Sequence, residues 1–499
     1  MQLDPDICYR ALTTRDARFD GRVFVAVRTT GIYCRPICPA RTPKRENVRF
    51  FPSAAAAQEA GFRPCLRCRP EISPDSAAWR GSSNTVSRAL ALIEAGALDS
   101  EGVEVLAERL GMGGRQLRRL FRQHLGASPL AVAQTRRVHL AKQLIHDTDL
   151  TMTEVALASG FGSVRRFNET FQRLFRRPPA SLRRGGRTRT PSSAAVSLQL
   201  TYRPPYDWEA MLAFLSARAI AGVETIVGGR YARTIAVGGA KGFLTVEPGK
   251  GHSLRVAVSL PRLDALPAVI AGVRRQFDLA ADPVSIGEHL AEDPLLAPLI
   301  AARPGLRSPG AWDGFELAVR AILGQQITVT AAAKLAARLA ETFGTEIEDP
   351  AARALGLTRL FPAPTQLAGR DIAALGLMPA ARAGALSNLA AVVADDPALL
   401  GPRGDLDQTV AALRALPGVG EWTAQYIAMR ALQETDAFPA ADIGLLRAMA
   451  DASGRRPTPA ELLARAERWR PWRAYAAAYL WAASPEAAPA RLAYDRRAA

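Results

Sequence analysis

Four of the five cysteines form two close pairs, and this constrains the N-terminal part of the chain more than any other sequence feature. Cys34 and Cys38 stand in TTGIYCRPICPAR, and Cys65 and Cys68 follow in FRPCLRCRP. Such spacing is typical of a tetrahedral zinc site with four thiolate ligands. A redox pair is the alternative, but the flanking sequence lacks a thioredoxin-like pattern of strands and helices. Cys8 lies outside the pattern and is expected to be a buried or free thiol.

Chain length and linker composition predict a multidomain protein. With 499 residues the chain is too long for one hydrophobic core, so about three or four domains are expected. Polar stretches rich in Gly, Ser, Thr and Arg mark a linker and a softer break after the cysteines. The expected divisions are residues 1–78, 84–183, a linker over 184–195, 196–305 and 306–486.

Residue patterns assign a fold class to each division. The first is expected to be a small α+β zinc domain, and the second to be all-α with two helix-turn-helix units. VSLQLTY, FLTVEP and LRVAVSL between residues 196 and 260 predict strands and hence an α+β third domain. From about residue 312 the sequence is helical, as in FELAVRAILGQQITVTAAAKLAARLAETFG, which predicts an all-α fourth domain.

Positive charge is concentrated in the first part of the chain. The net charge is +17, and residues 1–189 hold 32 Lys and Arg against 17 Asp and Glu. This excess favours nucleic acid as the partner, with an arginine-rich solvated surface as the alternative. We recognise no signal peptide and no run of about eighteen apolar residues, so we expect a cytoplasmic protein without a membrane partner.

The residues between and around the cysteine pairs also form a recognisable pattern. FVAVRTTGIYCRPICPARTPKRENVRFF and EAGFRPCLRCRP resemble the N-terminal domain of the Ada adaptive-response methyltransferases, over residues 1 to about 75. The resemblance implies one Zn²⁺ held by the four cysteines and a contact of Arg45 with DNA. It also implies that Cys34 takes a methyl group from a methyl phosphotriester of DNA. A purely structural zinc unit is the alternative.

Zinc–thiolate chemistry fits this role. Zinc keeps sulfur ionised at neutral pH, and the thiolate is the reactive form of cysteine. Methylated Cys34 would be a neutral thioether and a poor leaving group, so we expect an irreversible, stoichiometric step. The loss of one negative charge beside the DNA predicts tighter DNA binding after repair.

Two similar segments follow the zinc unit. Residues 103–129 and 152–182 each read as a helix, a glycine turn and a basic amphipathic helix, with PLAVAQTRRVHLAKQLI as a joining helix. An ordinary helical hairpin is the alternative for either copy. ASGFGSVRRFNETFQRLF makes the region resemble the AraC-type DNA-binding domain, which implies that it reads two adjacent major-groove segments. The side chains expected to contact DNA are Arg115, Arg118, Arg119, Ser163, Arg165 and Arg166.

A glycine hairpin and one carboxylate mark the C-terminal part. LRALPGVGEWTAQYIAMRAL places Gly418 and Gly420 between two helical runs, where backbone amides can face a phosphate. Asp442 follows in AFPAADIGLLR, and this combination resembles the helix-hairpin-helix glycosylase superfamily. Three further segments narrow the resemblance to an AlkA-type 3-methyladenine DNA glycosylase over about residues 196–485: QLTYRPPYDWEAMLAFLSARAIAGVETI, ARPGLRSPGAWDGFELAVRAILGQQ and AERWRPWRAYAAAYLW.

This second resemblance implies roles for individual residues. Asp442 is the expected catalytic carboxylate, because it can stabilise positive charge that develops on the sugar. Aromatic rings suit a cationic, flipped-out base, with core packing as the alternative for each ring. The ring positions that match the family's pocket are Trp422, Tyr426 and Trp481, with Tyr202 and Trp208 as weaker candidates.

Three departures from related enzymes shape the expected chemistry. Bifunctional relatives keep a lysine nucleophile where this chain has Trp422, so we expect base release without strand cleavage. No cysteine lies beyond Cys68, so no iron–sulfur cluster is expected, whereas a monovalent cation at the hairpin stays open. Relatives wedge an apolar side chain into the duplex at the position where this chain has Gln326. We therefore expect either a polar wedge at Gln326 or another residue in that role.

The resemblances together predict a monomeric DNA alkylation repair protein that joins a methyl acceptor, a DNA-binding module and a glycosylase. Its expected partners are double-stranded and alkylated DNA, with RNA polymerase as a further candidate. A methylation-responsive activator with a degenerate glycosylase is the alternative, and a glycosylase tethered to DNA by a structural zinc unit is a third interpretation. No Pro-Cys-His acceptor site is present, so repair of O-methylated guanine is not expected.

Overall fold

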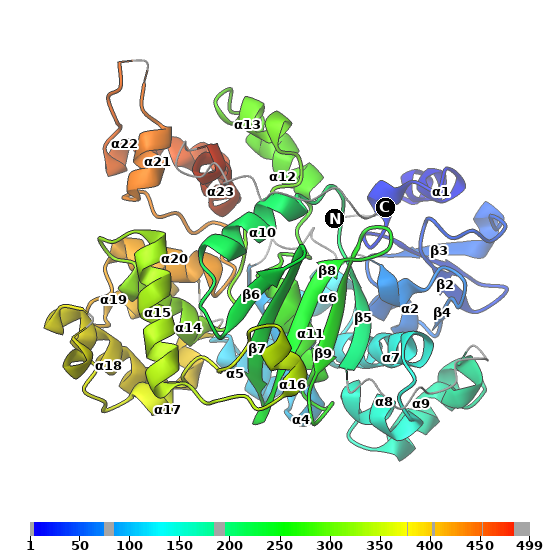
Figure 1. Cartoon of the computed structure of the whole chain (residues 1–499). Coiled ribbons are helices and arrows are strands. Elements are labelled where there is room, and N and C mark those ends of the chain that lie inside the picture. Colours follow the sequence, from blue (N-terminus) through cyan, green and yellow to red (C-terminus); the bar gives the residue numbers. More distant parts are fainter. Residues whose placement is uncertain are drawn as a thin grey trace.

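A computed structural model describes residues 4–73, 84–183, 195–376, 378–401, 405–451 and 453–483. Residues 1–3 and 74–78 of the expected first unit, 184–194 of the expected linker, and 484–486 lie outside the described residues. Figure 1 shows a five-stranded sheet in the middle of the molecule, between the N-terminal units and the C-terminal helices. A search of the described helices for one long and apolar enough to cross a membrane gives none.

The cysteine-bearing unit is built around a four-stranded mixed sheet in the order β3-β1-β2-β4. Its strands and helices are α1 (Pro5–Thr13), β1 (Phe24–Val27), β2 (Ile32–Cys34), β3 (Val48–Phe51), α2 (Ala54–Glu59) and β4 (Arg63–Pro64). Strand β2 ends at Cys34, and β4 precedes Cys65 directly. The parallel pairing of β2 with β4, in which Tyr33 faces Pro64, therefore brings the two cysteine pairs to one end of the sheet.

The second unit is entirely helical and contains two helix-turn-helix pairs, as the sequence predicts. Its helices are α3 (Asn84–Glu94), α4 (Ala97–Ser100), α5 (Val103–Arg109), α6 (Gly114–Leu125), α7 (Pro129–Asp147), α8 (Met152–Ala158) and α9 (Val164–Phe175). Helix α6 buries Leu117, Phe121 and Leu125 at helical spacing, which leaves its arginine-bearing side exposed.

The third unit contains an antiparallel sheet in the order β5-β9-β8-β7-β6. Its elements are β5 (Ala195–Thr201), α10 (Trp208–Ala217), β6 (Glu224–Val227), β7 (Arg230–Val237), β8 (Ala240–Pro248), β9 (Ser253–Ser259), α11 (Leu266–Gln276), α12 (Pro283–Leu290) and α13 (Leu296–Ala302). The three runs that predicted strands correspond to β5, β8 and β9. Strands β6 and β7 complete the sheet.

The C-terminal unit is all-α, so the expected fold class is confirmed throughout. Its helices are α14 (Gly314–Leu323), α15 (Val329–Phe343), α16 (Pro350–Ala354), α17 (Pro364–Leu367), α18 (Ala380–Asp395), α19 (Leu406–Arg414), α20 (Glu421–Arg430), α21 (Ile443–Ala448), α22 (Pro459–Ala466) and α23 (Arg473–Ala483). The long helical run expected from residue 315 is interrupted after Leu323. Thr328 caps α15 by accepting a hydrogen bond from Ala331 N at 3.2 Å, so a new helix begins there.

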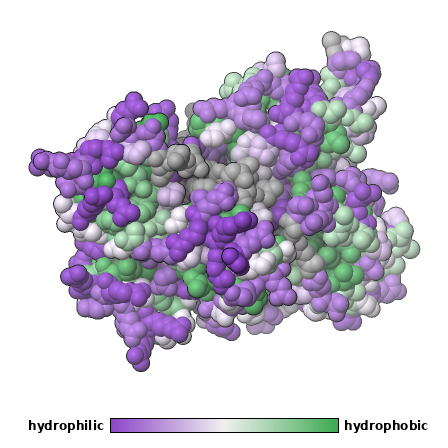
Figure 2. Space-filling model, turned by 180° about the vertical axis from the view of Figure 1, so that it is seen from behind, coloured by the Kyte–Doolittle hydropathy of each residue, from purple (hydrophilic) through white to green (hydrophobic). Residues whose placement is uncertain are grey.

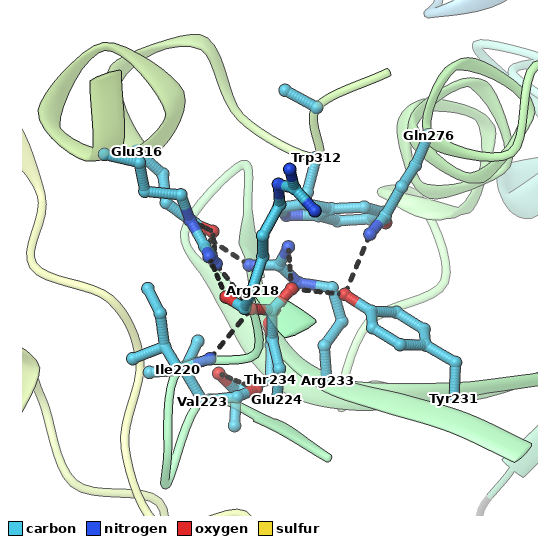
Figure 3. Close-up of polar contacts among 12 residues, drawn as sticks. Arg218, Ile220, Val223, Glu224, Tyr231, Arg233, Thr234, Gln276, Trp312 and Glu316 are labelled. Atoms are coloured by element: carbon cyan, nitrogen blue, oxygen red, sulfur yellow. Dashed lines mark hydrogen bonds and ion pairs between the residues drawn. The ribbon is translucent and has the colours of Figure 1, made fainter. Parts of the chain in front are cut away.

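A buried charged network joins the sheet to the C-terminal helices (Figure 3). Arg233 Nη2 on β7 lies 2.7 Å from Glu316 Oε2 on α14, and Tyr231 donates to Glu224 Oε1 at 2.6 Å. Arg320 also pairs with Glu224 and Glu316. Burial alone would raise the pKa of Glu316, but Arg233 and Arg320 hold it at about 2. The charged groups of the network pair with one another, and these pairs fix the sheet against α14.

Helix α7 connects the first three units. Lys142 is completely buried and donates to Glu71 Oε2 at 2.6 Å and to the carbonyl of Cys65 at 2.8 Å. The phenol oxygen Oη of Tyr33 and His139 Nε2 lie 2.7 Å apart, and burial lowers the pKa of His139 to about 4, so this histidine is neutral at physiological pH. Gln143 donates to the carbonyl of Gln199 in β5.

Two ion pairs fasten the N-terminal half to the C-terminal half. Arg22 pairs with Asp282 at the start of α12. Arg88 on α3 lies 2.6 Å from Glu434, which follows α20, and both side chains are buried. These two pairs, one of them buried on both sides, hold the N-terminal half against the C-terminal half.

The face of the molecule opposite to that in Figure 1 is mainly hydrophilic. Figure 2 shows purple side chains over most of it and green ones in separate small areas. Among the residues described on this face, apolar side chains therefore form no single broad patch, as is usual for a surface in water.

Replacement of Lys142 by methionine is expected to destabilise the N-terminal half. Glu71 would keep only Arg69 as a cationic partner, at 3.0 Å, and breaking a buried ion pair costs about 3 kcal/mol. Thermal unfolding followed by circular dichroism should show a midpoint several degrees lower. Lys44→Met is the control, because Lys44 is exposed and 4.0 Å from Glu46, and its midpoint should stay unchanged. An unchanged midpoint for Lys142→Met would contradict this role.

Candidate functional site

The four cysteines of the two pairs converge on one point. Their sulfur atoms all lie within 4.8 Å of one another, although they come from β2, the loop after it and the turn after β4. Two backbone amides also point at sulfur: Arg35 N donates to Cys68 Sγ and Arg67 N to Cys65 Sγ, each at 3.3 Å. Four sulfurs at this spacing suit a tetrahedral metal ion, so the donor set fits zinc.

A pocket of about 450 Å³ opens beside this cluster. Cys34, Cys38 and Cys65 line it, together with apolar side chains that include Val25 and Ile32. Cys34 is partly exposed, whereas the other three ligand residues are buried. Three arginines that the sequence did not single out also line the pocket: Arg41, Arg63 and Arg67.

Arg45 lies apart from these pocket residues. It begins a short 3₁₀ helix (Arg45–Asn47), and its guanidinium lies over the rings of Tyr9 and Phe50, at 5.8 and 5.5 Å from their centroids. It also lies 3.5 Å from Asp6. These contacts keep Arg45 on the surface of the zinc unit without bringing it to the cysteines.

The basic residues expected to contact DNA lie on the second helix of each helix-turn-helix pair. Arg115, Arg118 and Arg119 are exposed on α6, and Arg118 pairs with Glu104. Arg165 and Arg166 are exposed near the start of α9, whose cap, Ser163, accepts from Arg166 N at 3.2 Å. Exposed arginines at the beginning of a slim helix can reach the edges or the backbone of DNA.

The glycine hairpin joins α19 to α20. Gly418 has φ +78°, and a Cβ there would lie 2.5 Å from that of Ala385, so only glycine fits without displacement of α18. Gly420 caps α20, and no heavy atom lies within 4 Å of the place its Cβ would take. The first turn of α20 therefore faces open space, where a phosphate can approach.

Asp442 is held in place by three hydrogen-bond donors. Trp422 Nε1 donates to Oδ2 and Trp481 Nε1 donates to Oδ1, both at 2.8 Å. Leu445 N donates to Oδ1 at 3.0 Å, because Asp442 caps α21. Gly444 leaves room for this arrangement, since a Cβ there would lie 3.0 Å from Oδ1. The carboxylate is half-buried and has one fixed orientation.

The aromatic rings expected around Asp442 are together. Trp422 and Tyr426 stack with centroids 5.2 Å apart and planes 8° from parallel, and Tyr426 meets Trp481 edge-on at 6.4 Å. The weaker candidates lie elsewhere: Tyr202 packs on Tyr206, and Trp208 stacks on Phe277, in the core of the third unit. Tyr202 and Trp208 are thus partly buried residues that pack against the core of the third unit.

Gln326 projects from the turn between α14 and α15. It is exposed and has φ +60°, a left-handed conformation that is uncommon for a residue with a side chain. Gln325 holds the turn by donating to Gly418 O at 2.9 Å and to Thr423 Oγ1 at 3.1 Å, and Arg382 donates to Gln325 O. The turn that presents Gln326 is therefore tied to the hairpin.

Sequence reasoning missed Gln325, Gly444 and Arg430. Arg430 is buried at the end of α20, and its guanidinium carbon lies over the rings of Tyr426 and Trp481, at 5.7 and 5.2 Å from their centroids. A signal was present, because Trp422, Tyr426 and Arg430 follow at intervals of four and so share one side of a helix. For Gln325 and Gly444 no local pattern distinguishes them from their neighbours.

Four family models match the chain. They are the metal binding domain of Ada at residues 7–71, a helix-turn-helix domain at 106–185, the AlkA N-terminal domain at 197–313, and the HhH-GPD superfamily base excision DNA repair protein at 319–474. The order along the chain is that of the four structural units.

Similar proteins are known from several bacteria. A probable bifunctional transcriptional activator/DNA repair enzyme AlkA of Mycobacterium tuberculosis is 43% identical over 485 residues, which is 96% of this chain and 97% of that protein. DNA-3-methyladenine glycosylase 2 of Escherichia coli is 39% identical over 56% of this chain and 95% of its own length. Bifunctional transcriptional activator/DNA repair enzyme Ada of Escherichia coli is 36% identical over 32% of this chain and 43% of its own length.

The four-cysteine cluster is expected to bind one zinc ion per chain. Protein that has been stripped of metal and reloaded with Co²⁺ should show the intense sulfur-to-cobalt absorption of a tetrahedral four-thiolate site. Cys68→Ser should weaken binding and change this spectrum, because one thiolate is lost. Cys8→Ser is the matched control, since Cys8 is buried in α1 and lies outside the cluster. Loss of the cobalt spectrum in Cys8→Ser alone would refute the assignment.

Proposed function

Because the chain belongs to the family of bifunctional Ada/AlkA-type transcriptional activators and DNA repair enzymes, we propose that it repairs alkylated DNA by two separate chemistries. Cys34 accepts methyl groups from DNA methyl phosphotriesters, once per chain. The C-terminal half is a DNA-3-methyladenine glycosylase that releases alkylated purines catalytically. The observation that carries the second activity is the carboxylate of Asp442, held by two indole N–H groups beside the hairpin.

The methyl transfer is a displacement at carbon. Bound Zn²⁺ would keep the four sulfurs ionised as thiolates at neutral pH. Cys34 Sγ attacks the methyl carbon, an S–C bond forms, and the C–O bond breaks with its electron pair left on the phosphodiester oxygen. The apolar wall of the pocket suits an esterified, uncharged phosphate, and Arg41, Arg63 and Arg67 suit its charged neighbours. The product is a thioether, so the step is irreversible.

Methylation of Cys34 also changes the charge that faces DNA. Four thiolates on one Zn²⁺ carry a formal charge of minus two, and one methyl group reduces it to minus one. The zinc unit then repels the DNA backbone less, which strengthens binding at the target promoter. We propose that the AraC-type unit uses this change to activate transcription, with RNA polymerase as its partner.

Base excision relies on Asp442. Cleavage of the glycosidic bond leaves positive charge on the sugar, and a carboxylate in a fixed orientation stabilises that charge without reorganising. Water then completes the hydrolysis. Trp422 stands where a lyase would need an amine, and an indole cannot form a Schiff base, so the enzyme releases the base without cutting the strand.

The surroundings of Asp442 suit a flipped-out purine. Trp422, Tyr426 and Trp481 offer ring faces for an alkylated base, and the amides at Gly418 and Gly420 suit a backbone phosphate. We assign the wedge that fills the gap in the duplex to Gln326, on account of its exposure and of the tether between its turn and the hairpin.

One chain supplies both recognition helices, α6 and α9, so DNA reading does not require a second copy, and we propose that the protein acts as a monomer. A cytoplasmic location follows from its DNA substrate and from the need for reduced thiols at the zinc site.

Exposure of the zinc-loaded protein to DNA that carries methyl phosphotriesters should add one methyl group to Cys34. Peptide mass spectrometry locates it, because breaking the peptide between Cys34 and Cys38 in the spectrometer assigns the added mass to one of the two. Cys8→Ser should still accept the methyl group, and Cys34→Ser should not. Zinc that stays bound with no cysteine methylated would reduce this unit to a structural role.

Asp442→Asn should lower the rate of release of methylated purines by at least about a hundredfold, since a neutral amide cannot stabilise the sugar cation. Chromatography of the freed bases measures the rate, and a gel shift should show unchanged DNA binding. Asp451→Asn is the matched control, because this exposed aspartate accepts hydrogen bonds from Ser453 and Arg455 within its own turn in the described part of the chain. A normal rate in Asp442→Asn would overturn the catalytic assignment. No release by the wild-type protein would favour an activator with a degenerate glycosylase.

A further inference from the structure

A buried positive charge lies against the rings that surround Asp442. Arg430 is 3% exposed, and its guanidinium carbon is 5.2 Å from the ring centroid of Trp481 and 5.7 Å from that of Tyr426. Trp481 is also a donor to Asp442, and Tyr426 stacks on the other donor, Trp422. The guanidinium therefore contacts two of the three rings of the base pocket.

The polar contacts of this guanidinium are few. Nη1 donates to the carbonyl of Pro309 at 2.9 Å and, at 3.4 Å, to Ser308 Oγ, whereas Nε is buried without a hydrogen-bond partner. Burial lowers the pKa of Arg430 and the phenol of Tyr426 opposes this, but an arginine remains charged at any physiological pH. The Tyr426 phenol and the carboxylate of Asp278 stabilise its charge, together with the ring faces.

A second cation, Arg218, lies close by at the end of α10. Phe214 on α10 is contacted by Arg430 at 4.9 Å and by Arg218 at 3.9 Å from its centroid. The carbonyl of Arg218 accepts from Arg320 at 2.6 Å, within the network of Figure 3. The position of Arg430 is thus fixed through Phe214 and through Pro309, and the nearby charge of Arg218 repels its own.

A buried cation of this kind is costly when apolar packing would suffice. An apolar side chain of similar length would fill the same space without the loss of hydration that a buried guanidinium suffers. Rings attract cations through their faces, and a guanidinium that already lies over a ring repels a second cation bound to it. The rings in question are those that would receive an alkylated, positively charged base.

We propose that Arg430 is a specificity-determining residue of the base pocket, which weakens the pocket's preference for cationic bases and so lets neutral damaged purines compete. The proposal rests on the glycosylase function and adds a charge-based control of its substrate range. Arg430 acts on the base through Tyr426 and Trp481 and takes no part in bond cleavage. Its charge, rather than its shape, sets the ratio of the two rates.

Single-turnover excision from two duplexes tests this, one containing 7-methylguanine, which is cationic, and the other hypoxanthine, which is neutral. Arg430→Gln and Arg430→Met remove the charge, and Arg430→Lys keeps it. The two neutral variants should excise both bases more slowly but raise the ratio of 7-methylguanine to hypoxanthine rates at least about tenfold, the factor expected for two unit charges about 12 Å apart at an effective dielectric constant of about 20. Arg430→Lys should keep the wild-type ratio.

Arg307→Gln is the matched control for loss of a buried arginine. Arg307 is 2% exposed, donates to backbone carbonyls and lies over Tyr206, away from the pocket rings. It should leave the ratio unchanged even if the protein is destabilised. Equal slowing of both bases in the neutral variants, or the same ratio change in Arg430→Lys, would overturn the proposal. Either result leaves the glycosylase function intact, whereas that function fails if the wild-type protein releases neither base.

Discussion

The arrangement of the whole molecule depends on one buried lysine and the helix that carries it. Lys142 donates to Glu71 and to the carbonyl of Cys65, which belongs to the four-cysteine cluster. The same helix, α7, joins the two helix-turn-helix pairs and reaches β5 through Gln143. Helix α7 therefore connects the cysteine cluster directly to the helices that are expected to read DNA. Under the proposed function, this continuity would couple methylation of Cys34 to DNA binding, because packed elements transmit displacement.

Each of the two proposed reaction sites holds a negatively charged group in position, but by different contacts. At the four-cysteine site a bound Zn²⁺ would keep the sulfurs ionised, and two backbone amides donate to Cys65 and Cys68. At the second site the carboxylate of Asp442 is kept in one orientation by two indoles and a helix terminus. Both groups are negative and face a negative polymer. Each is accompanied by cations, Arg41, Arg63 and Arg67 at the first and Arg430 at the second.

Much of this organisation was predictable, because its signals are local. Three patterns lie within short segments of the sequence: the cysteine spacing, the two copies of helix, turn and basic helix, and the glycine hairpin. The fold class follows from them. The end of α14 was not predicted, because Gly324 to Ile327 lie within a sequence of helical composition and only the tie from Gln325 to the hairpin reveals the turn. Lys142 and Arg430 were missed for a similar reason. Their partners are remote in sequence, so burial of a charged residue at each position becomes visible only in three dimensions.

The central claim is that one chain carries a stoichiometric and a catalytic repair activity. A time course of wild-type protein on excess DNA that contains both methyl phosphotriesters and 3-methyladenine tests it most directly, with protein-bound methyl and free base measured in the same samples. The account predicts that bound methyl stops at one per chain while free base continues to accumulate to many per chain. Base release that stops at or below one per chain, or bound methyl that exceeds one, would contradict it.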